Sequence, residues 1–365
     1  MSGKHLPKVL IVCGGTGGHI YPALAIADAL KLQGVGPIFF AGRKGSMEDK
    51  LITPNWKFES ISAVPLTRGS ILQNLTLPFK LAKSLLQARK VVARVKPTFV
   101  VATGGYVSLP IILAAGLAKI PVYLQEQNAV AGIANRIGAK FATKIFVTSE
   151  DAAKAFPQGK TSIQGNPVRA LPSHGSLPVP AEFEGYAHKV LVLGGSQGAQ
   201  GINQKIEATL AHIAMRKDIA LVWQAGVKNV DAIEKRSPLP PNVSLAGFLN
   251  PVYGYIDAAD LIISRAGAST LAELLAFGKP SILFPFPFAT ANHQEHNARV
   301  LERAGACLVE LDSDPNGLWN KVEQLFDHPE QLQLLASKAK SLGVSDAADR
   351  IAKEILLKEQ KHDSI

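Results

Sequence analysis

The chain has 365 residues, of which 47% are hydrophobic and 19% are charged, so it can bury more than one core and is not disordered in composition. The nearly apolar stretches at 109–118 and 281–288 are too short to span a bilayer, and the run before Gly14 is too short for a secretory signal. We therefore expect no transmembrane helix and a cytosolic chain. Two cysteines, Cys13 and Cys307, are too few for a disulfide framework or a cysteine-based zinc site.

The net charge of +10 is distributed unevenly along the chain. Up to Arg169 there are 21 Lys and Arg against 7 Asp and Glu, a net charge of +14, whereas the remainder carries −4. A basic half attracts a polyanion such as a membrane surface, a pyrophosphate or a nucleic acid. A basic surface that is merely solvated is the alternative.

Short β-branched runs alternate with segments of helical period, which is the pattern of parallel βαβ units. Strands are expected at 8–13, 38–41, 99–102, 122–125 and 144–147, with helices from about Ile20 and from Pro78 to Lys96. A proline-rich linker at 167–180 precedes strands at 189–193, 220–224, 243–246, 261–264 and 281–284, and an amphipathic helix at 346–358. The pattern predicts an α/β protein with two tandem Rossmann-like, doubly wound domains, 1–166 and 181–345, which face each other across a cleft, followed by a C-terminal helix at 346–365.

Each half opens with a strand, a glycine-rich loop and a helix. The loops read GGTGGH at 14–19 and GGSQGA at 194–199, and a third loop, TGGY, follows the strand that ends at 102. Backbone N–H groups in such loops, together with the helix dipole, favour phosphate. Neither loop fits G-x-G-x-x-G, Arg43 and Lys44 stand where an NAD site carries an acid, and no P-loop motif occurs. The loops therefore predict a phosphate compound that is not a nicotinamide dinucleotide.

The segment 264–298 carries the densest polar pattern of the second half. Small residues at 266–270 let a ligand approach the start of a helix, and Glu273 can accept hydrogen bonds from both hydroxyls of a ribose. A solvated or capping carboxylate is the alternative for Glu273. His293 and His296 have a spacing that could hold a metal, but no third ligand accompanies them.

The second glycine-rich loop also satisfies G-x-S-x-G, the nucleophile elbow of α/β-hydrolases. Ser196 would then be the nucleophile, with Asp260 and His293 as its partners. This alternative leaves the first half of the chain unexplained.

Six motifs in order resemble the bacterial UDP-N-acetylglucosamine transferases of peptidoglycan synthesis, which are GT-B glycosyltransferases of family 28. They are GGTGGH at 14–19, GGYVS at 104–108, EQN at 126–128, GNPVR at 165–169, GGSQGA at 194–199 and the segment 265–297. The resemblance implies an inverting hexosyltransferase that moves GlcNAc from UDP-GlcNAc to the 4-hydroxyl of undecaprenyl-pyrophosphoryl-MurNAc-pentapeptide. It implies no required cofactor and no metal.

The resemblance also implies partners and a location. The partners are UDP-GlcNAc, the lipid-linked acceptor, an anionic membrane surface, and other proteins of cell-wall synthesis, cell shape and cell division, with no nucleic acid. The protein is expected at the cytoplasmic face of the inner membrane as a peripheral protein.

Carried over residue by residue, the resemblance assigns donor and acceptor contacts. The donor residues are Gly15, Thr16, Gly17, Asn128, Arg169, Ser196, Leu249, Ala268, Ser269, Thr270, Leu271, Ala272, Glu273 and Gln294. The acceptor residues are Gly18, His19, Gly104, Gly105 and Tyr106. The chain departs from the family pattern at Gln125, where His is frequent, and at Leu109, where Gly is common, and both positions lie on the acceptor side.

His19 is expected to act as, or to position, the general base, because it directly follows the first glycine-rich loop and an imidazole titrates near neutrality. A histidine that binds acceptor phosphate or caps the helix is the alternative. Glu126 is the next candidate for the catalytic base.

The helix expected at 78–96 combines an apolar stripe with a separate basic arc. The stripe, assigned to the core, is Leu81, Leu85, Ala88, Val92 and Val95. We expect a membrane-facing surface made of Leu75, Phe79, Lys80, Lys83, Leu86, Lys90 and Arg94. Packing of Phe79 and Leu86 against a neighbouring loop is the alternative.

Two further functions stay open at this point. A catalytically silent sensor would bind UDP-GlcNAc without transferring the sugar. A UDP-GlcNAc 2-epimerase shares the GT-B plan but needs no lipid, which would leave the basic half without a role.

Overall fold

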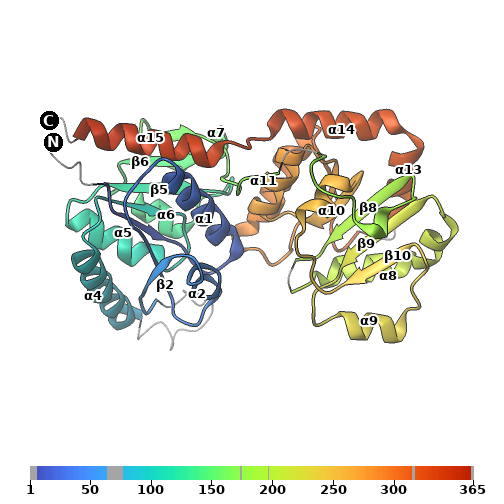
Figure 1. Ribbon diagram of the computed structural model, residues 1–365, viewed down its shortest axis with the longest axis horizontal. Coiled ribbons are helices and arrows are strands. Elements are labelled where there is room, and N and C mark those ends of the chain that lie inside the picture. The colour runs from blue at the N-terminus through green and yellow to red at the C-terminus, as the bar shows by residue number, and fades with distance from the viewer. Residues whose placement is uncertain (1–5, 64–76, 173–174, 196, 315–316, 363–365) are drawn as a thin grey trace. The chain divides into compact units, whose positions relative to one another are not determined.

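The structure is a computed structural model that describes residues 6–63, 77–172, 175–195, 197–314 and 317–362 (Figure 1). The chain forms two compact units, one of Met1–Ala170 with Val344–Ile365 and one of Leu171–Gly343. All ten strands expected from the sequence are present, and each unit is an open parallel sheet with helices on both faces. The expected α/β class with two doubly wound units is confirmed.

The first unit is built on a parallel sheet with the strand order β3-β2-β1-β4-β5-β6-β7. Its strands are β1 (Val9–Val12), β2 (Ile38–Gly42), β3 (Lys57–Ser60), β4 (Phe99–Ala102), β5 (Val122–Glu126), β6 (Lys144–Val147) and β7 (Thr161–Ile163). Its helices are α1 (Gly17–Leu32), α2 (Met47–Ile52), α4 (Leu77–Val95), α5 (Ser108–Leu117), α6 (Ile133–Gly138), α7 (Glu150–Ala153) and α15 (Ala347–His362).

Successive residues of these strands supply two cores on opposite faces of the sheet, as the two-residue period of a strand requires. Val9 and Ile11 of β1 pack with α1 and α15, whereas Leu10 and Val12 pack with α4 and α5. Figure 1 shows α15 lying along α1. Helix α15 buries Ile351 there, and Tyr123 Oη of β5 donates a hydrogen bond of 2.6 Å to Glu359 Oε1.

The second unit repeats this plan with the strand order β10-β9-β8-β11-β12-β13. Its strands are β8 (His188–Leu193), β9 (Ile219–Gln224), β10 (Val243–Ala246), β11 (Leu261–Arg265), β12 (Ser281–Phe284) and β13 (Leu308–Val309). Its helices are α8 (Gln200–Met215), α9 (Val230–Arg236), α10 (Tyr253–Ala258), α11 (Ala268–Phe277), α12 (His293–Arg303), α13 (Leu318–Asp327) and α14 (Pro329–Leu342), with 3₁₀ turns η1 (Ala181–Phe183) and η2 (Thr290–Asn292).

The order of strands reverses direction once in each sheet, between β1 and β4 in the first and between β8 and β11 in the second. Ligands of doubly wound sheets bind outside the carboxyl ends of the strands at such a reversal. The glycine-rich loops follow β1, β4 and β8, so they lie at these positions.

Helix α4 forms where the sequence predicts it, but one residue of its core stripe was assigned wrongly. Leu81 is 45% exposed, whereas Ala88, Val92 and Val95 are buried as expected. The buried part of the helix begins only at Ser84, one turn after Leu81, and Val91 joins the core instead. Among the helices that the structure describes, none combines the length and the apolar character needed to cross a bilayer.

Candidate active site

Two glycine-rich loops of the first unit cross at the carboxyl ends of β1 and β4. A Cβ atom on Gly105 would lie 2.1 Å from the carbonyl oxygen of Gly14, and Gly105 has a φ of +86°, so glycine is required there. The crossing brings Tyr106 against the first loop, where a Cβ on Gly15 would meet its ring at 3.3 Å. Burial raises the pKa of the Tyr106 hydroxyl, Arg43 lowers it and Glu48 raises it.

His19 lies in the first turn of α1 and is held by the residue that follows β4. Its Nδ1 is 3.0 Å from the carbonyl oxygen of Thr103, and Thr103 Oγ1 donates a hydrogen bond of 2.7 Å to the His19 carbonyl. The side-chain amide of Gln127 also contacts Nδ1. The Thr103 carbonyl can only accept, whereas the Gln127 amide can present either its NH₂ or its oxygen, so Thr103 decides the tautomer. Nδ1 therefore carries the proton, and the lone pair of the neutral ring lies on Nε2.

Glu126 ends β5 with a carboxylate that is 1% exposed. It accepts hydrogen bonds from the backbone N–H groups of Asn128 at 3.0 Å and Gly132 at 2.9 Å, and from the amides of Asn128 at 3.2 Å and Asn135 at 3.0 Å. These four donors hold the buried carboxylate in place and fix the loop that carries Asn128. This arrangement favours a positioning role for Glu126 over that of a base reaching the acceptor.

The sequence interpretation missed three residues that hold this site: Thr103, Gln127 and Asn135. Thr103 and Gln127 directly follow β4 and β5, and a position just beyond the carboxyl end of a strand was the signal that could have found them. The departure at Gln125 is fully buried, and its amide donates to Asn166 Oδ1 at 3.2 Å. The departure at Leu109 is half-buried in the first turn of α5.

In the second unit, the glycines of the loop 194–199 allow close backbone packing. A Cβ on Gly194 would lie 2.7 Å from the carbonyl oxygen of Gln224, and one on Gly198 would lie 2.0 Å from that of Ala225. Packing therefore accounts for both glycines without a ligand. Ser196 lies outside the described residues, so its predicted diphosphate contact stays a prediction.

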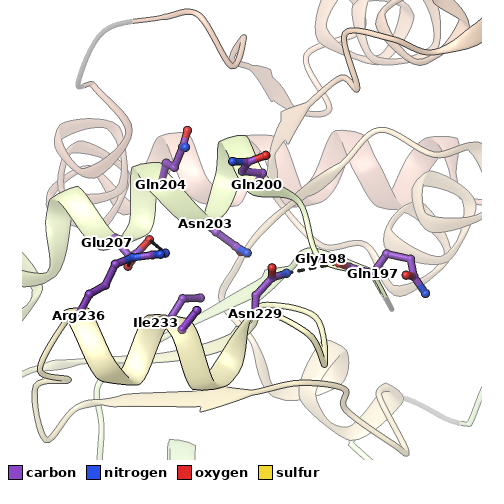
Figure 2. Close-up of a pocket in the computed structure, with 10 residues that line it drawn as sticks. Gln197, Gly198, Gln200, Asn203, Gln204, Glu207, Asn229, Ile233 and Arg236 are labelled. Carbon is purple, nitrogen blue, oxygen red and sulfur yellow. Dashed lines mark hydrogen bonds and ion pairs between the residues drawn. The ribbon is translucent and has the colours of Figure 1, made fainter.

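A pocket of about 610 Å³ lies between α8 and α9, on the flank of this loop (Figure 2). Arg236 pairs with Glu207 at 2.8 Å inside it, and Asn229 Nδ2 donates to the carbonyl oxygen of Gln197 at 3.3 Å. None of the described residues that are expected to bind UDP-GlcNAc lines this pocket. The lining residues are Gln197, Gly198, Gln200, Asn203, Gln204, Glu207, Asn229, Ala232, Ile233 and Arg236.

The start of α11 carries the residues that the resemblance assigns to the diphosphate and the ribose. Ala268, Ser269, Thr270, Leu271 and Ala272 form its first turns. Ser269 Oγ is buried and has no hydrogen-bond partner among the described residues, so a bound oxygen or hydroxyl would satisfy it. One turn later, the half-buried Glu273 accepts a hydrogen bond of 3.1 Å from Tyr253 Oη through Oε1.

Two further residues of this unit that are expected to bind UDP-GlcNAc also form hydrogen bonds within the protein. Gln294, in the first turn of α12, accepts a hydrogen bond from the backbone N–H of Phe286 at 3.0 Å and so ties α12 to the loop after β12. Leu249 is buried, and its N–H donates to Gln224 Oε1 at 3.0 Å. A backbone contact between Leu249 and uracil would therefore involve the Leu249 carbonyl.

The alternative of a serine hydrolase fails on topology. Asp260 directly precedes β11 and accepts a hydrogen bond from the N–H of Lys189, near the start of β8, at 2.8 Å. It therefore lies at the amino ends of the strands, whereas the loop around position 196 follows the carboxyl end of β8. Strands of five or six residues separate the two by about 16 to 20 Å.

Other reactive groups do not form a second centre in the described part of the chain. No three His, Cys, Asp or Glu side chains there cluster as metal ligands would, and His296 Nδ1 lies 2.9 Å from the carbonyl oxygen of Asn292. Burial raises the pKa of the Cys13 thiol well above its usual range and that of Cys307 to about 12. Neither thiol is a nucleophile at neutral pH.

Comparison with known proteins decides the family. The model of the Glycosyltransferase family 28 N-terminal domain matches residues 9–147, and that of the Glycosyltransferase family 28 C-terminal domain matches residues 189–351. The chain belongs to glycosyltransferase family 28. The family resemblance expected from the six motifs is confirmed, and the chain is a glycosyltransferase.

The family 28 enzyme has relatives of almost the same length. The UDP-N-acetylglucosamine--N-acetylmuramyl-(pentapeptide) pyrophosphoryl-undecaprenol N-acetylglucosamine transferase of Desulfitobacterium hafniense strain Y51 is 40% identical over 359 residues, which cover 94% of this chain and 97% of the relative. The crystal structure of MurG from Acinetobacter baumannii is 26% identical, has a TM-score of 0.76, and is matched over 96% of this chain and 99% of that one. The expected GT-B fold is thereby confirmed.

A UDP-GlcNAc 2-epimerase from Neisseria meningitidis, solved with bound UDP-GlcNAc, has the same fold. It is 18% identical with a TM-score of 0.68, and the match covers 96% of this chain and all of the epimerase. Because that identity is low, the likeness concerns the fold alone. The family models that match both halves of this chain are those of glycosyltransferases.

Proposed function

We propose that the enzyme transfers GlcNAc from UDP-GlcNAc to the 4-hydroxyl of undecaprenyl-pyrophosphoryl-MurNAc-pentapeptide and inverts the anomeric centre from α to β. The observation that carries this proposal is the full-length identity of 40% to a transferase named for that reaction. The product is the lipid-linked disaccharide precursor of peptidoglycan.

His19 is the general base of the proposed reaction. With Nδ1–H directed at the Thr103 carbonyl, Nε2 takes the proton of the acceptor 4-hydroxyl. The hydroxyl oxygen forms a bond to the anomeric carbon of GlcNAc while the bond from that carbon to the UDP diphosphate breaks. A single displacement of this kind inverts the anomeric centre, and the negative charge leaves with UDP.

The leaving diphosphate needs positive potential, and the chain supplies it without a metal in this proposal. In the second unit, the N-terminus of α11, a helix of 10 residues, carries partial positive charge. Ser269 Oγ would contact the diphosphate oxygens and Glu273 the ribose. The family resemblance implies that Arg169, an exposed cation at the end of the first unit's main segment, also contacts the diphosphate. These groups are oriented before the reaction, so no ion has to be recruited.

The basic arc of α4 is the membrane-facing surface of the proposed enzyme. Phe79 and Leu86 are 80% and 60% exposed, which does not favour packing against a neighbouring loop. Lys80, Lys83 and Lys90 are exposed beside them, Arg94 pairs with Glu59, and Leu75 lies outside the described residues. Exposed apolar side chains next to a row of cations suit an anionic lipid surface.

Two other exposed apolar side chains of the first unit lie together at the end of α5, which packs against α4. Helix α5 ends in Leu117, which is 64% exposed. Phe141, from the segment after α6, lies against Gly116 of α5 and is 37% exposed.

A transfer assay with radiolabelled UDP-GlcNAc and a lipid-pyrophosphate acceptor tests the proposed function. The label should appear in the lipid fraction, with one UDP released for each sugar transferred. Conversion of the donor to its 2-epimer would identify an epimerase. Donor binding without release of UDP would identify a sensor, and either result would refute the proposal.

A further inference from the structure

The feature that the reaction above does not use is a buried carboxylate beneath the first glycine-rich loop, residues 14–19. Glu48 is the second residue of α2 and is 1% exposed. Ser46 fixes the start of that helix, because its Oγ accepts a hydrogen bond from the N–H of Asp49 and donates one of 2.5 Å to the Arg43 carbonyl. The rigid start of α2 turns Glu48 toward the loop.

Glu48 links the loop to the segment after β2 through its two oxygens. Oε1 accepts a hydrogen bond of 3.2 Å from the N–H of Arg43, and Oε2 accepts one of 3.5 Å from the N–H of Gly15. Two glycines make room for it: a Cβ on Gly14 would lie 2.8 Å from Oε1, and one on Gly42 would lie 2.7 Å from Cγ. At these two positions the absence of a side chain is explained by the carboxylate and not by a ligand.

The carboxylate also settles which part of the loop can bind an anion. The Gly15 N–H points at Glu48, so it is not offered to a phosphate. The opposite side of Gly15 is covered by Tyr106, whose hydroxyl pKa is raised in part by Glu48. The loop is thus clamped at Gly14 and Gly15, and substrate contacts are left to its later residues, from Thr16 to His19.

We propose that Glu48 is a positioning residue, whose buried carboxylate holds the first glycine-rich loop in the conformation that presents Thr16 to His19 to the substrates. This inference rests on the proposed function, because His19 is the base of that reaction. Glu48 touches neither substrate; it acts through the backbone of Gly15 and thereby on the direction in which α1 begins.

Glu48→Gln tests the inference, because it keeps the size of the side chain but leaves one acceptor oxygen, so the N–H groups of Gly15 and Arg43 can no longer both be accepted. We expect kcat to fall about tenfold to a hundredfold, as a misplaced base would produce. The donor KM should stay within about twofold, because the uridine and ribose contacts lie in the second unit. Hydrogen exchange of the amides at 14–19 should accelerate about tenfold, whereas that of α8 stays unchanged.

Asp49→Asn is the matched control, because it neutralises the next residue of the same short helix. The Asp49 carboxylate accepts a hydrogen bond of 2.7 Å from the exposed N–H of Gly45 and does not contact the glycine-rich loop, so kcat and loop exchange should remain at wild-type values. Glu48→Asp keeps the charge on a shorter side chain and should show a smaller loss than Glu48→Gln. It also carries the test if Glu48→Gln does not fold.

The results distinguish a failure of the proposed function from a failure of the role proposed for Glu48. An inactive wild-type enzyme in the transfer assay refutes the proposed function, whereas loop exchange can still be measured on Glu48→Gln and Glu48→Asp. An active wild type with kcat and loop exchange unchanged in Glu48→Gln, or in Glu48→Asp if that variant carries the test, overturns the role of Glu48. A rise in donor KM with unchanged kcat also overturns it, because the loop would then serve donor affinity and not the base.

Discussion

The position of the proton on His19 determines what this side chain can do. The Thr103 carbonyl requires a proton on Nδ1, which leaves Nε2 as the basic nitrogen, and the second contact through Thr103 Oγ1 fixes the backbone that carries the ring. A base aligned in this way contributes typically 10² to 10⁴ in rate.

His19→Ala should therefore lower kcat by about a hundredfold or more, while the donor KM changes little. Steady-state kinetics with both substrates varied would measure this. Glu126→Gln should act differently, because its four donors would lose one acceptor oxygen and the Asn128 loop would shift, which affects both kcat and the donor KM. A loss of less than tenfold in His19→Ala would remove His19 from the role of base.

Glu273 is the residue on which ribose recognition is expected to depend. Replacing a carboxylate that makes charge-assisted hydrogen bonds costs about 1.5 to 3 kcal/mol, so Glu273→Ala should raise the donor KM about tenfold to a hundredfold. Tyr253→Phe, which removes only the hydroxyl that orients Glu273, should raise it a few-fold. Glu234→Ala on the exposed face of α9 is the control, and a donor KM that is equal in Glu273→Ala and the control would contradict the assignment.

Residues whose role depends on burial were beyond the reach of the sequence. Helix α2 starts with Met-Glu-Asp, and nothing in this sequence indicates which of the two carboxylates is buried. In the structure Glu48 is buried and Asp49 is not. Which of them turns inward depends on the packing of α2 against the loop after β1, which involves residues more than thirty positions away. The place of His19 after a glycine-rich loop is local in sequence and could be recognised there, whereas its role as the base stays a prediction.

At the scale of elements, the sequence predicts every central strand and misses three of the four edge strands; β10 is the edge strand that was expected. The ten expected strands are mostly buried runs such as β1 and β4, whereas β3, β7 and β13 were not expected. Each of the three lies at the edge of its sheet. An edge strand buries one side, so β3 mixes Lys57 and Glu59 with Phe58 and lacks the apolar run that identifies a buried strand.

Helix α4 is the element whose surface can be tested independently of catalysis. Each lysine near an anionic leaflet contributes about 1 kcal/mol, so reversing Lys80, Lys83 and Lys90 to Glu should weaken binding to vesicles that contain anionic lipid at least a hundredfold. Co-sedimentation at low and high salt would measure this, with binding of the wild type falling as salt rises.

Reversal of Lys217, Lys235 and Lys338, which are exposed on the second unit, changes the net charge by the same amount and is the matched control. It should sediment nearly as the wild type does. Both variants should bind UDP-GlcNAc normally. Equal sedimentation of the two triple variants would place the docking surface outside α4.

At the scale of the whole molecule, the proposal of catalysis without a metal gives a direct test. Fixed dipoles and Arg169 are expected to stabilise the leaving diphosphate, so excess EDTA should leave the rate of transfer within about twofold of its initial value. Loss of activity in EDTA that a divalent cation restores would show that an ion takes part.

The two units should also unfold separately, because each has its own cores on both faces of its sheet. Ile351→Ala in α15 removes a fully buried side chain from the first unit and should cost about 2 to 5 kcal/mol. Calorimetry should show one transition moved to lower temperature and the other unchanged. A common shift of both transitions would indicate that the units unfold together.

Helix α15 belongs to the first unit although it follows the second unit in sequence, so the first unit cannot finish folding until the second has been synthesised. The face of the first sheet that holds Ile11 and Tyr123 is covered in part by Ile351 and Ile355 of α15. The ribosome adds these two residues only after the whole second unit. At about 5 to 20 residues per second, the block 171–343 delays this cover by roughly 10 to 35 s. During that interval the part of this face that α15 covers in the folded protein stays exposed on the nascent chain, although the first unit is the first to be translated.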